Sequence, residues 1–337
     1  MRGVIMHAPR DVRVEDRENP TIIEPTDAII RIAASCICGS DLWPYRGTDK
    51  VADTPMGHEY VGIVTEIGDD VREIKIGDFV VGSFFASDNT CEICQAGYQS
   101  RCVHATGLDG TQAEYARIPF ADGTLVATPG LPDADLIPSL LAASDVLGTG
   151  WFAAVAAEAG PGKTVAVVGD GAVGLLGILA AKQLGAERII AMSRHADRQA
   201  LAREFGATDV VEERGDAGVD KIKELTNGLG AHSVIEAVGT QESMMQAIRA
   251  TRPGGHVGYV GVSHDVELPG LELFYSGVHL HGGPAPVRRF LPQLIQLIWD
   301  RTIDPGKVFD LALPLERAAD GYKAMDERRA TKVLLTV

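Results

Sequence analysis

The sequence predicts an α/β fold that combines a doubly wound parallel sheet with a second, mainly β domain. Three observations predict it. A buried strand, a glycine-rich turn and an apolar helix follow one another over residues 164–184. Strands and helices alternate after that point, which is typical of a parallel sheet with helices on both faces. Before it, short strands are separated by glycines, as in a partly antiparallel barrel.

The glycine-rich turn has the spacing of a dinucleotide-binding fingerprint. Residues 165–168 form an apolar run, and glycines follow at 169, 171 and 174 in G-x-G-x-x-G spacing. The first glycine permits the tight turn, the second lets the backbone approach a pyrophosphate, and the third lets the helix pack closely on the strand. The N-terminus of the helix that follows would attract the phosphates of a dinucleotide. The alternative interpretation of this turn is a strand–helix corner that binds no ligand. The predicted cofactor-binding residues here are Gly169, Gly171, Ala172, Val173 and Gly174.

The alternation of strands and helices after the glycine-rich turn predicts the remaining elements of the chain. Expected strands cover residues 188–192, 210–211, 232–235, 255–260 and 278–281. Expected helices cover residues 196–205, 219–226, 241–250 and 291–299. A single helix is expected from Leu140 to Ala159, ended by Pro161-Gly162, and residues 332–337 read as a closing strand.

The chain before the glycine-rich turn is long enough for a domain of its own. Roughly 160 residues precede the turn, about one whole domain, with expected strands at residues 12–15, 28–32, 61–64 and 78–81. We therefore expect residues 1–147 and 287–337 to form a catalytic domain, and residues 148–286 to form the dinucleotide-binding domain.

Composition and charge argue against several classes of function. The 337 residues are 45% hydrophobic and carry a net charge of −15, which argues against binding to nucleic acid or to an anionic membrane. We expect no signal peptide, because Pro9, Arg10 and Asp11 interrupt the N-terminal apolar residues, and hence a cytoplasmic protein. No apolar run is long enough to cross a bilayer. Five cysteines, an odd number, favour metal binding over a disulfide framework.

One candidate metal centre combines a thiolate, an imidazole and a carboxylate. A catalytic zinc takes three protein ligands and keeps one position open, and Cys38, His58 and Asp145 are chemically suitable. Their spacing alone does not select them, because a buried cysteine, a core histidine and a helix-capping aspartate are the structural alternatives.

Five motifs resemble those of the zinc-dependent medium-chain alcohol dehydrogenases, within the medium-chain dehydrogenase/reductase superfamily. They are Cys38-Gly39-Ser40-Asp41, Gly57-His58-Glu59, the cysteine-bearing segment 88–102, residues 145–150 and residues 168–174. The match runs end to end and in the same order. The resemblance implies a GroES-like catalytic domain joined to a Rossmann domain, action on a small alcohol or carbonyl compound, and a homodimer or homotetramer.

The resemblance also implies roles for individual residues. Cys38, His58 and Asp145 match the ligands of the catalytic zinc; many members have cysteine at the last position, and some have aspartate as here. Glu59 matches the carboxylate beside the zinc, either as a partner behind the ligands or as an intermittent ligand. Ser40 matches the hydroxyl that relays the proton of the substrate.

The proton relay departs from the family pattern after Ser40. The family often has a histidine five residues after the first zinc ligand, where this chain has Trp43. The proton must then leave by another route, through water or the cofactor ribose, or leave more slowly. Asp41 is either a participant or a local cap of its turn. Trp43 and Phe84 are expected to line the substrate pocket, with core packing as the alternative.

The cysteine-bearing segment resembles the structural zinc lobe of the family. The family pattern is C-x2-C-x2-C-x7-C, and here Asp88 stands at the first position, before Cys91, Cys94 and Cys102. Three thiolates and a carboxylate can bind zinc tetrahedrally; the alternative is a lobe that has lost its metal. Cys36 lies outside both groups and is expected to be a small buried hydrophobe.

The second strand of the parallel sheet bears on cofactor choice. A carboxylate about 20 residues beyond the glycines would favour NAD, but this strand ends in Ser193-Arg194-His195 without an acid. Ser193 and Arg194, with Arg198 further on, suit a 2′-phosphate, so we expect NADP(H) in preference to NAD(H). The alternative is a polar helix start and NAD without a ribose carboxylate. Val260, Gly261 and Val262 resemble a segment beside the nicotinamide, or are loop residues.

The sequence therefore predicts a zinc-dependent enzyme that interconverts an alcohol and its aldehyde or ketone with NADP(H). Zinc would stabilise the alkoxide from which hydride leaves. Two alternatives stay open: a zinc-free quinone or enoyl reductase of the same superfamily, and a non-catalytic NADPH-binding protein. The remaining histidines match no ligand spacing and receive no role; they lie at positions 7, 104, 232, 256, 264, 279 and 281.

Overall fold

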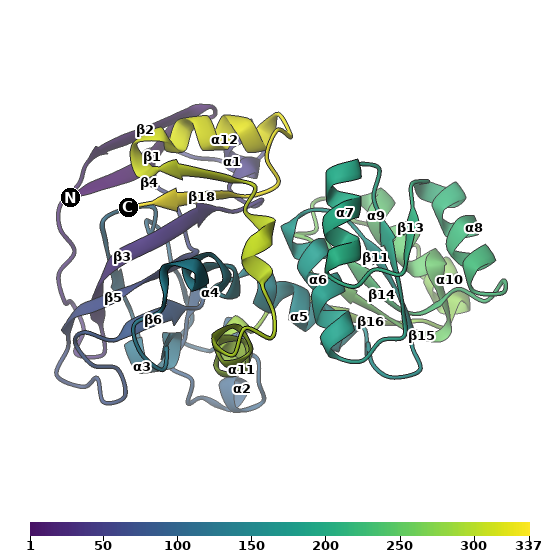
Figure 1. The fold of residues 1–337 in the computed structure, drawn as a ribbon, viewed down its shortest axis with the longest axis horizontal. Coiled ribbons are helices and arrows are strands. Elements are labelled where there is room, and N and C mark those ends of the chain that lie inside the picture. Colours follow the sequence, from purple (N-terminus) through teal and green to yellow (C-terminus); the bar gives the residue numbers. More distant parts are fainter. The chain divides into compact units, whose positions relative to one another are not determined.

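The computed structural model describes residues 1–337 and divides into two compact units. The first unit contains Met1–Asp145 and Pro286–Val337, and the second contains Val146–Ala285. These breaks lie two residues and one residue before the expected domain boundaries. The first unit thus combines the purple start and the yellow end of the chain (Figure 1).

The second unit is built on a six-stranded sheet in the order β13-β12-β11-β14-β15-β16. Every neighbouring pair is parallel, which confirms the doubly wound sheet. The order reverses between β11 and β14, the switch point where such sheets bind ligands at the carboxyl ends of their strands. The strands are β11 (Thr164–Val168), β12 (Arg188–Met192), β13 (Asp209–Val211), β14 (Ala231–Glu236), β15 (Thr251–Tyr259) and β16 (His279–Gly282).

Helices connect these strands because parallel neighbours need crossover connections. Apolar side chains from the strands and from the facing helices form the core, with Val167, Ile190 and Val234 fully or almost fully buried. The helices are α5 (Val146–Ala156), α6 (Ala172–Gln183), α7 (Ala196–Glu204), α8 (Gly215–Leu225), α9 (Gln241–Ala250) and α10 (Gly270–Ser276).

The expectation of one helix from Leu140 to Ala159 is wrong. Helix α4 (Ile137–Ala143) ends before Ser144, and α5 begins at Val146. The Ser144 hydroxyl donates to the Leu141 carbonyl oxygen at 2.7 Å, so the side chain competes with the helical backbone. The second helix also ends early, at Ala156, and Glu158 follows in a left-handed conformation with φ of 53°.

The first unit is mainly β. One sheet follows the order β10-β6-β5-β3-β18-β17, with β9 also paired to β3, and a three-stranded sheet follows β2-β1-β4. The strands of the large sheet are β3 (Ala28–Ile37), β5 (Tyr60–Ile67), β6 (Phe79–Gly82), β9 (Tyr115–Ile118), β10 (Leu125–Ala127), β17 (Leu311–Pro314) and β18 (Val333–Thr336). The smaller sheets use β1 (Arg2–Ala8), β2 (Asp11–Asp16) and β4 (Thr54–Pro55), and the pair β7 (Phe85–Ala86) and β8 (Thr106–Gly107).

The first unit also contains six α-helices. They are α1 (Leu42–Arg46), α2 (Glu92–Gln95), α3 (Ala121–Thr124), α4, α11 (Val287–Trp299) and α12 (Ala318–Asp326). No single helix is both long and apolar enough to cross a bilayer, although the bent pair of segments 134–143 and 146–156 reaches that length and composition together.

The register of the large sheet brings distant segments to one end of it. Ser35 of β3 lies opposite Tyr60, the first residue of β5, and Ile37 lies opposite Val333, the first residue of β18. Residues just after β3, just before β5 and just before β18 therefore meet. These residues include Cys38, Glu59 and Lys332.

Candidate metal centres and cofactor-binding turn

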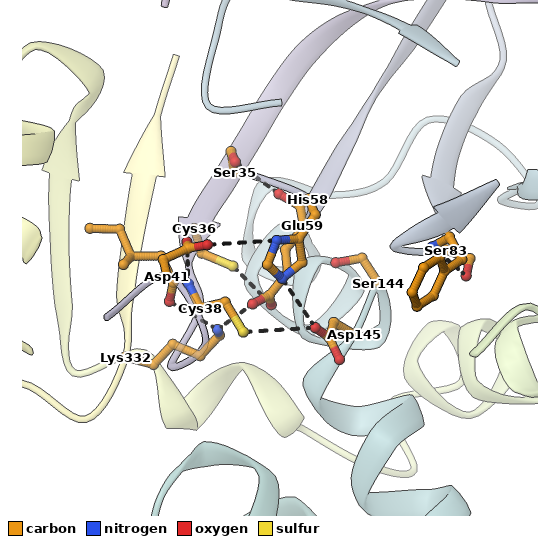
Figure 2. A network of polar contacts seen from close by, with 12 residues as sticks. Ser35, Cys36, Cys38, Asp41, His58, Glu59, Ser83, Ser144, Asp145 and Lys332 are labelled. Carbon is orange, nitrogen blue, oxygen red and sulfur yellow. Dashed lines mark hydrogen bonds and ion pairs between the residues drawn. The ribbon is translucent and has the colours of Figure 1, made fainter. Parts of the chain in front are cut away.

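The first unit brings Cys38, His58, Glu59 and Asp145 into one cluster, which we call the catalytic cluster. Their possible ligand atoms all lie within 4.8 Å of one another (Figure 2). Asp145 Oδ2 is 3.8 Å from Cys38 Sγ and 3.5 Å from His58 Nε2. Zinc bonds of about 2.3 Å to sulfur and about 2.0–2.1 Å to nitrogen or oxygen place tetrahedral ligands roughly 3.3–3.6 Å apart. The donor types and their spacing therefore fit a zinc ion.

Local backbone features position these side chains. Gly57, with φ of 100°, comes directly before His58, and a Cβ at this glycine would lie 2.6 Å from the Gln112 backbone nitrogen. Only glycine fits there without displacing the neighbouring chain. Asp145 stands at the break between α4 and α5, so the interruption that the sequence did not predict is what places its carboxylate.

Asp41 supports both Cys38 and His58. Its Oδ2 accepts a hydrogen bond of 3.0 Å from the Cys38 backbone N–H, and its Oδ1 lies 3.7 Å from His58 Nδ1. Asp41 thus caps its turn, as one alternative expected, and it also faces the ring nitrogen of His58 opposite Asp145. Burial alone would lower the pKa of His58, but Cys38, Asp145 and Asp41 raise that pKa well above its usual value.

Lys332 and Cys36 each contact one oxygen of the Glu59 carboxylate. Lys332 Nζ lies 2.7 Å from Glu59 Oε1 and donates to the Ile37 carbonyl oxygen at 3.1 Å, while Cys36 Sγ lies 3.1 Å from Glu59 Oε2. Burial raises the pKa of Cys36 well above its usual value, so the thiol is a donor. Cys36 is buried as expected, but the description as a hydrophobe is wrong because it takes part in this polar network. Lys332 received no role in the site from the sequence. The signal that could have indicated it is a charged residue directly before an apolar strand.

The predicted pocket residues lie on different elements. The Phe84 ring meets the His58 ring edge to face, with centroids 6.2 Å apart, and packs against Phe85. Trp43 is half-buried on α1, and Ser40 is half-buried on the turn between Cys38 and that helix. Phe84 therefore contacts the catalytic cluster directly, whereas Ser40 and Trp43 are placed by the turn that follows Cys38.

A second cluster, the cysteine lobe, consists of Asp88, Cys91, Cys94 and Cys102. Its ligand atoms also lie within 4.8 Å of one another. Cys91 Sγ is 3.8 Å from Cys102 Sγ, and Cys94 Sγ is 3.5 Å from Asp88 Oδ1, close to the roughly 3.6–3.8 Å of tetrahedral zinc ligands. All five cysteines of the chain are free thiols. The lobe therefore retains a donor set and spacing that fit zinc.

Hydrogen bonds and burial act in opposite directions on the thiols of the cysteine lobe. Backbone N–H groups, first that of Cys94, lower the pKa of Cys91 to about 7, while burial raises the pKa of Cys94 and Cys102. Asp88 Oδ2 lies 2.7 Å from His104 Nδ1, and its Oδ1 accepts from the Thr90 and Cys91 N–H groups. His104 received no role from the sequence, because its ligand spacing is irregular.

The glycine-rich turn of the second unit fits a dinucleotide phosphate. A Cβ on Gly174 would lie 2.0 Å from the Gly169 carbonyl oxygen, whereas a Cβ on Gly171 would meet nothing within 4 Å. Gly174 is thus required by helix packing, and Gly171 leaves open space beside the backbone. Ala172 and Val173 begin α6, which has no side-chain cap at its N-terminus. The first N–H groups of this helix lack intrahelical partners and can bind an anion.

The residues expected beyond the glycines lie at the carboxyl edge of the same sheet. Ser193 follows β12 and is 2% exposed, and Arg194 beside it is exposed. Val260 and Gly261 follow β15, and their N–H groups donate to the Glu236 carbonyl oxygen. Val262 is 56% exposed.

Asp170, which sequence reasoning passed over, contacts two of the expected phosphate-binding residues. Its Oδ2 accepts from the Ser193 hydroxyl at 2.8 Å, and its Oδ1 lies 3.2 Å from Arg198 Nη1. A carboxylate of the glycine-rich turn therefore lies beside the end of β12, where the strand itself has no acid.

Comparisons with known proteins agree with this arrangement. Residues 24–130 match the family model of the alcohol dehydrogenase GroES-like domain, and residues 172–300 match that of the zinc-binding dehydrogenases. The chain is 35% identical to zinc-type alcohol dehydrogenase B of Aspergillus flavus, over 99% of this chain and 81% of that protein. It is 31% identical to an NADP-dependent isopropanol dehydrogenase of Entamoeba histolytica, over 91% of this chain and 87% of that protein.

A solved structure shows the same fold. Alcohol dehydrogenase TADH from Thermus sp. ATN1 matches with a TM-score of 0.91 and 31% identity, and the match covers 100% of both chains. The GroES-like domain and the parallel sheet are thus both confirmed, and the chain belongs to the zinc-dependent medium-chain alcohol dehydrogenases.

Proposed function

We propose that this chain interconverts an alcohol and its aldehyde or ketone by hydride transfer, with a catalytic zinc and with NADP(H) preferred over NAD(H). The observation that supports it most is the catalytic cluster, where a thiol, an imidazole and a carboxylate have the mutual spacing of tetrahedral zinc ligands. A zinc ion there would act as a Lewis acid toward the oxygen of an alcohol or carbonyl group.

The residues around the ligands have distinct proposed tasks. Cys38, His58 and Asp145 hold the zinc, and Asp41 holds the His58 ring in place through Nδ1. Lys332 and Cys36 occupy both oxygens of Glu59, which favours a supporting role for this carboxylate over that of a permanent ligand. Ser40 takes the substrate proton and passes it to water or to the cofactor ribose, because Trp43 cannot accept it. Phe84 and Trp43 exclude water from the pocket.

The cofactor assignment is supported by two observations. Ser193 and Arg194 stand at the end of β12 and offer a hydroxyl and a guanidinium to a 2′-phosphate. One relative is an NADP-dependent enzyme. The open space at Gly171 and the uncapped N-terminus of α6 would receive the pyrophosphate, with Val260, Gly261 and Val262 beside the nicotinamide.

The cysteine lobe is proposed to hold a second, structural zinc through Asp88, Cys91, Cys94 and Cys102, since these four atoms have the required spacing. Five free thiols suit a reducing compartment, which supports the proposed cytoplasmic location.

A second copy of the chain is the proposed partner of α10 and β16. No residue of α10 is buried, and Leu271, Phe274 and Tyr275 are 73%, 76% and 76% exposed. Strand β16 pairs only with β15, so its other edge is open. An open edge beside exposed aromatic side chains favours association. Sedimentation velocity should show a dimer or tetramer that Phe274→Glu weakens and that the control Leu131→Glu, on the first unit, leaves intact.

Metal analysis and one substitution test the proposed function. Purified protein should hold one or two zinc ions per chain, and Cys38→Ala should abolish alcohol-dependent reduction of NADP while NADPH still binds, as measured by fluorescence titration. Full activity in Cys38→Ala would favour the zinc-free quinone or enoyl reductase. Zinc and NADPH binding without turnover, across a panel of alcohols, ketones and sugars, would favour the non-catalytic binding protein.

A further inference from the structure

We propose that Asp170, between the first two glycines of the fingerprint, weakens the preference for NADP(H) over NAD(H). Its carboxylate lies where the 2′-hydroxyl of NAD or the 2′-phosphate of NADP would bind. The inference rests on the proposed use of a nicotinamide dinucleotide. It concerns the residue that sets the ratio of the affinities for NADP(H) and NAD(H), and it holds whichever of the two cofactors the enzyme prefers.

The register of the sheet explains why Asp170 reaches the end of the neighbouring strand. Strands β11 and β12 are parallel, and their last residues, Val168 and Met192, lie opposite each other. Asp170 is the second residue after β11, and Ser193 is the first after β12. Gly169, with φ of 116°, turns the chain between them so that the Asp170 side chain crosses to the β12 side.

The Asp170 carboxylate engages the groups that would otherwise serve a 2′-phosphate. The Ser193 hydroxyl donates to Oδ2 at 2.8 Å, and Arg198 Nη1 lies 3.2 Å from Oδ1. The side chains of Asp170 and Arg198 are 11% and 15% exposed, so water screens this ion pair only partly. Ser193 also accepts from the His195 N–H at 3.3 Å, which fixes its hydroxyl toward the carboxylate. The charge of Arg198 is therefore already compensated.

The two cofactors interact oppositely with a carboxylate in this place. The 2′-hydroxyl of NAD can donate a hydrogen bond to it, as it does to the strand-end acid of NAD-binding folds. A 2′-phosphate is an acceptor with a charge of about −1.5 to −2 near neutral pH, so the carboxylate repels it and competes with it for Ser193 and Arg198. Exposed Arg194 attracts the phosphate instead, and the ratio between the cofactors reflects these opposing charges.

The test compares nucleotide halves with and without the 2′-phosphate, and therefore needs neither zinc nor an alcohol. Titration calorimetry measures the dissociation constants of 2′,5′-ADP and of 5′-AMP for the wild type and for Asp170→Asn. Asparagine keeps the size of the side chain and still accepts from Ser193, while it removes the charge. Asp220→Asn, an exposed carboxylate on α8, is the matched control for net charge.

We expect Asp170→Asn to increase the preference for 2′,5′-ADP over 5′-AMP at least about tenfold, from removal of one nearby like charge, and Asp220→Asn to change it less than about twofold. Adding Arg198→Ala to Asp170→Asn should remove part of the gain, because the freed guanidinium then contributes to phosphate binding. Thermal unfolding verifies that each variant is folded, and Asp170→Ser replaces Asp170→Asn if that variant is not.

Two results would overturn the inference about Asp170, and only the second of them would also contradict the proposed cofactor function. If both nucleotides bind and the preference is the same in Asp170→Asn and the wild type, Asp170 does not discriminate, while the proposed dinucleotide function stands. If neither nucleotide binds to any variant, the proposed cofactor function fails as well.

Discussion

Lys332 Nζ lies 2.7 Å from Glu59 Oε1, and the two side chains are 1% and 0% exposed. Burial alone would lower the pKa of Lys332, but Cys36 and Glu59 raise that pKa well above its usual value, so the ammonium stays charged. The pair is further hydrogen-bonded through the Ile37 carbonyl and the Cys36 thiol. A buried ion pair with satisfied partners holds its geometry rigidly, and here it fixes the Glu59 carboxylate within the catalytic cluster.

Removing one partner of this pair should be strongly destabilising. Lys332→Met leaves the Glu59 charge buried and unpaired, which costs about 3–5 kcal/mol of unfolding free energy. Urea denaturation measures the change, with the exposed Lys323→Met as control. Combining Lys332→Met with Glu59→Leu should restore part of the stability, because neither charge of this pair is then left buried without its partner. A loss below about 1 kcal/mol in Lys332→Met would show that the pair carries little of the stability.

Two glycines of the fingerprint should respond differently to alanine. Gly174→Ala places a methyl group 2.0 Å from the Gly169 carbonyl oxygen, so the melting temperature should fall. Gly171→Ala meets no protein atom within 4 Å and should leave that temperature nearly unchanged, but weaken NADPH binding in a fluorescence titration. Unaltered NADPH affinity in Gly171→Ala would contradict the placement of the pyrophosphate at this turn.

Ser40 should affect turnover more than binding. Loss of the hydroxyl in Ser40→Ala removes the first proton acceptor, and kcat for alcohol oxidation should fall about 100-fold, within the range for general acid–base groups. The KM for alcohol should change little, and Ser40→Thr should recover most of the rate. Steady-state kinetics decide the point: a rise in KM at constant kcat would indicate that Ser40 only shapes the pocket.

Asp88 should determine how firmly the cysteine lobe holds its metal. Asp88→Asn can still accept from the Thr90 N–H, but it offers zinc no negative charge. We expect loss of one zinc per chain and a lower melting temperature, whereas the exposed Asp69→Asn should change neither. Equal metal content in Asp88→Asn and the wild type would argue that three thiolates suffice or that His104 replaces Asp88.

The Arg188–Asp209 pair should make stability depend on pH in the acid range. Arg188 donates two hydrogen bonds, of 2.8 and 2.7 Å, to the Asp209 carboxylate and lowers its pKa. Because the folded-state pKa is lowered, this stabilisation is present above the unfolded value of about 3.9 and is lost as the pH falls through the folded value. Asp209→Asn should lower the unfolding free energy by about 0.5–1 kcal/mol at pH 7, since the pair is partly exposed.

Urea unfolding between pH 2 and 7 tests this dependence, because the loss begins near an unfolded pKa of about 3.9 and continues to lower pH. The difference between Asp209→Asn and the wild type should shrink toward acid, and the control Asp220→Asn should show none. If the difference in unfolding free energy stays constant with pH, the effect of Asp209→Asn comes from hydrogen bonding by the side chain and not from the carboxylate charge.

The sequence predicted most of what depends on local pattern. The strand at 188–192 and the helix at 241–250 were assigned with the bounds that the structure has, because apolar periodicity and flanking polar residues define them. Helix α10 was missed because its apolar side chains are exposed, so it has no buried face to reveal. The break at Ser144 was missed because one side-chain hydrogen bond decides it.

The same distinction applies to the candidate site. The ligand types of the catalytic cluster followed from motifs, and the structure brings all four together. Lys332 and Asp170 were missed because their partners are distant in sequence, and only strand register shows that they meet. The assignment of ligand, relay and cofactor roles stays a prediction that the experiments above address.

The position of β18 has a consequence for the order in which the protein is assembled on the ribosome. Lys332 is synthesised 273 residues after Glu59, and β18 lies between β3 and β17, so the large sheet stays incomplete until residues 333–336 have been translated. The second unit is made without interruption and can fold first. Nascent chains stalled before residue 333 should therefore have a protease-resistant nucleotide domain beside a first unit that is still digestible.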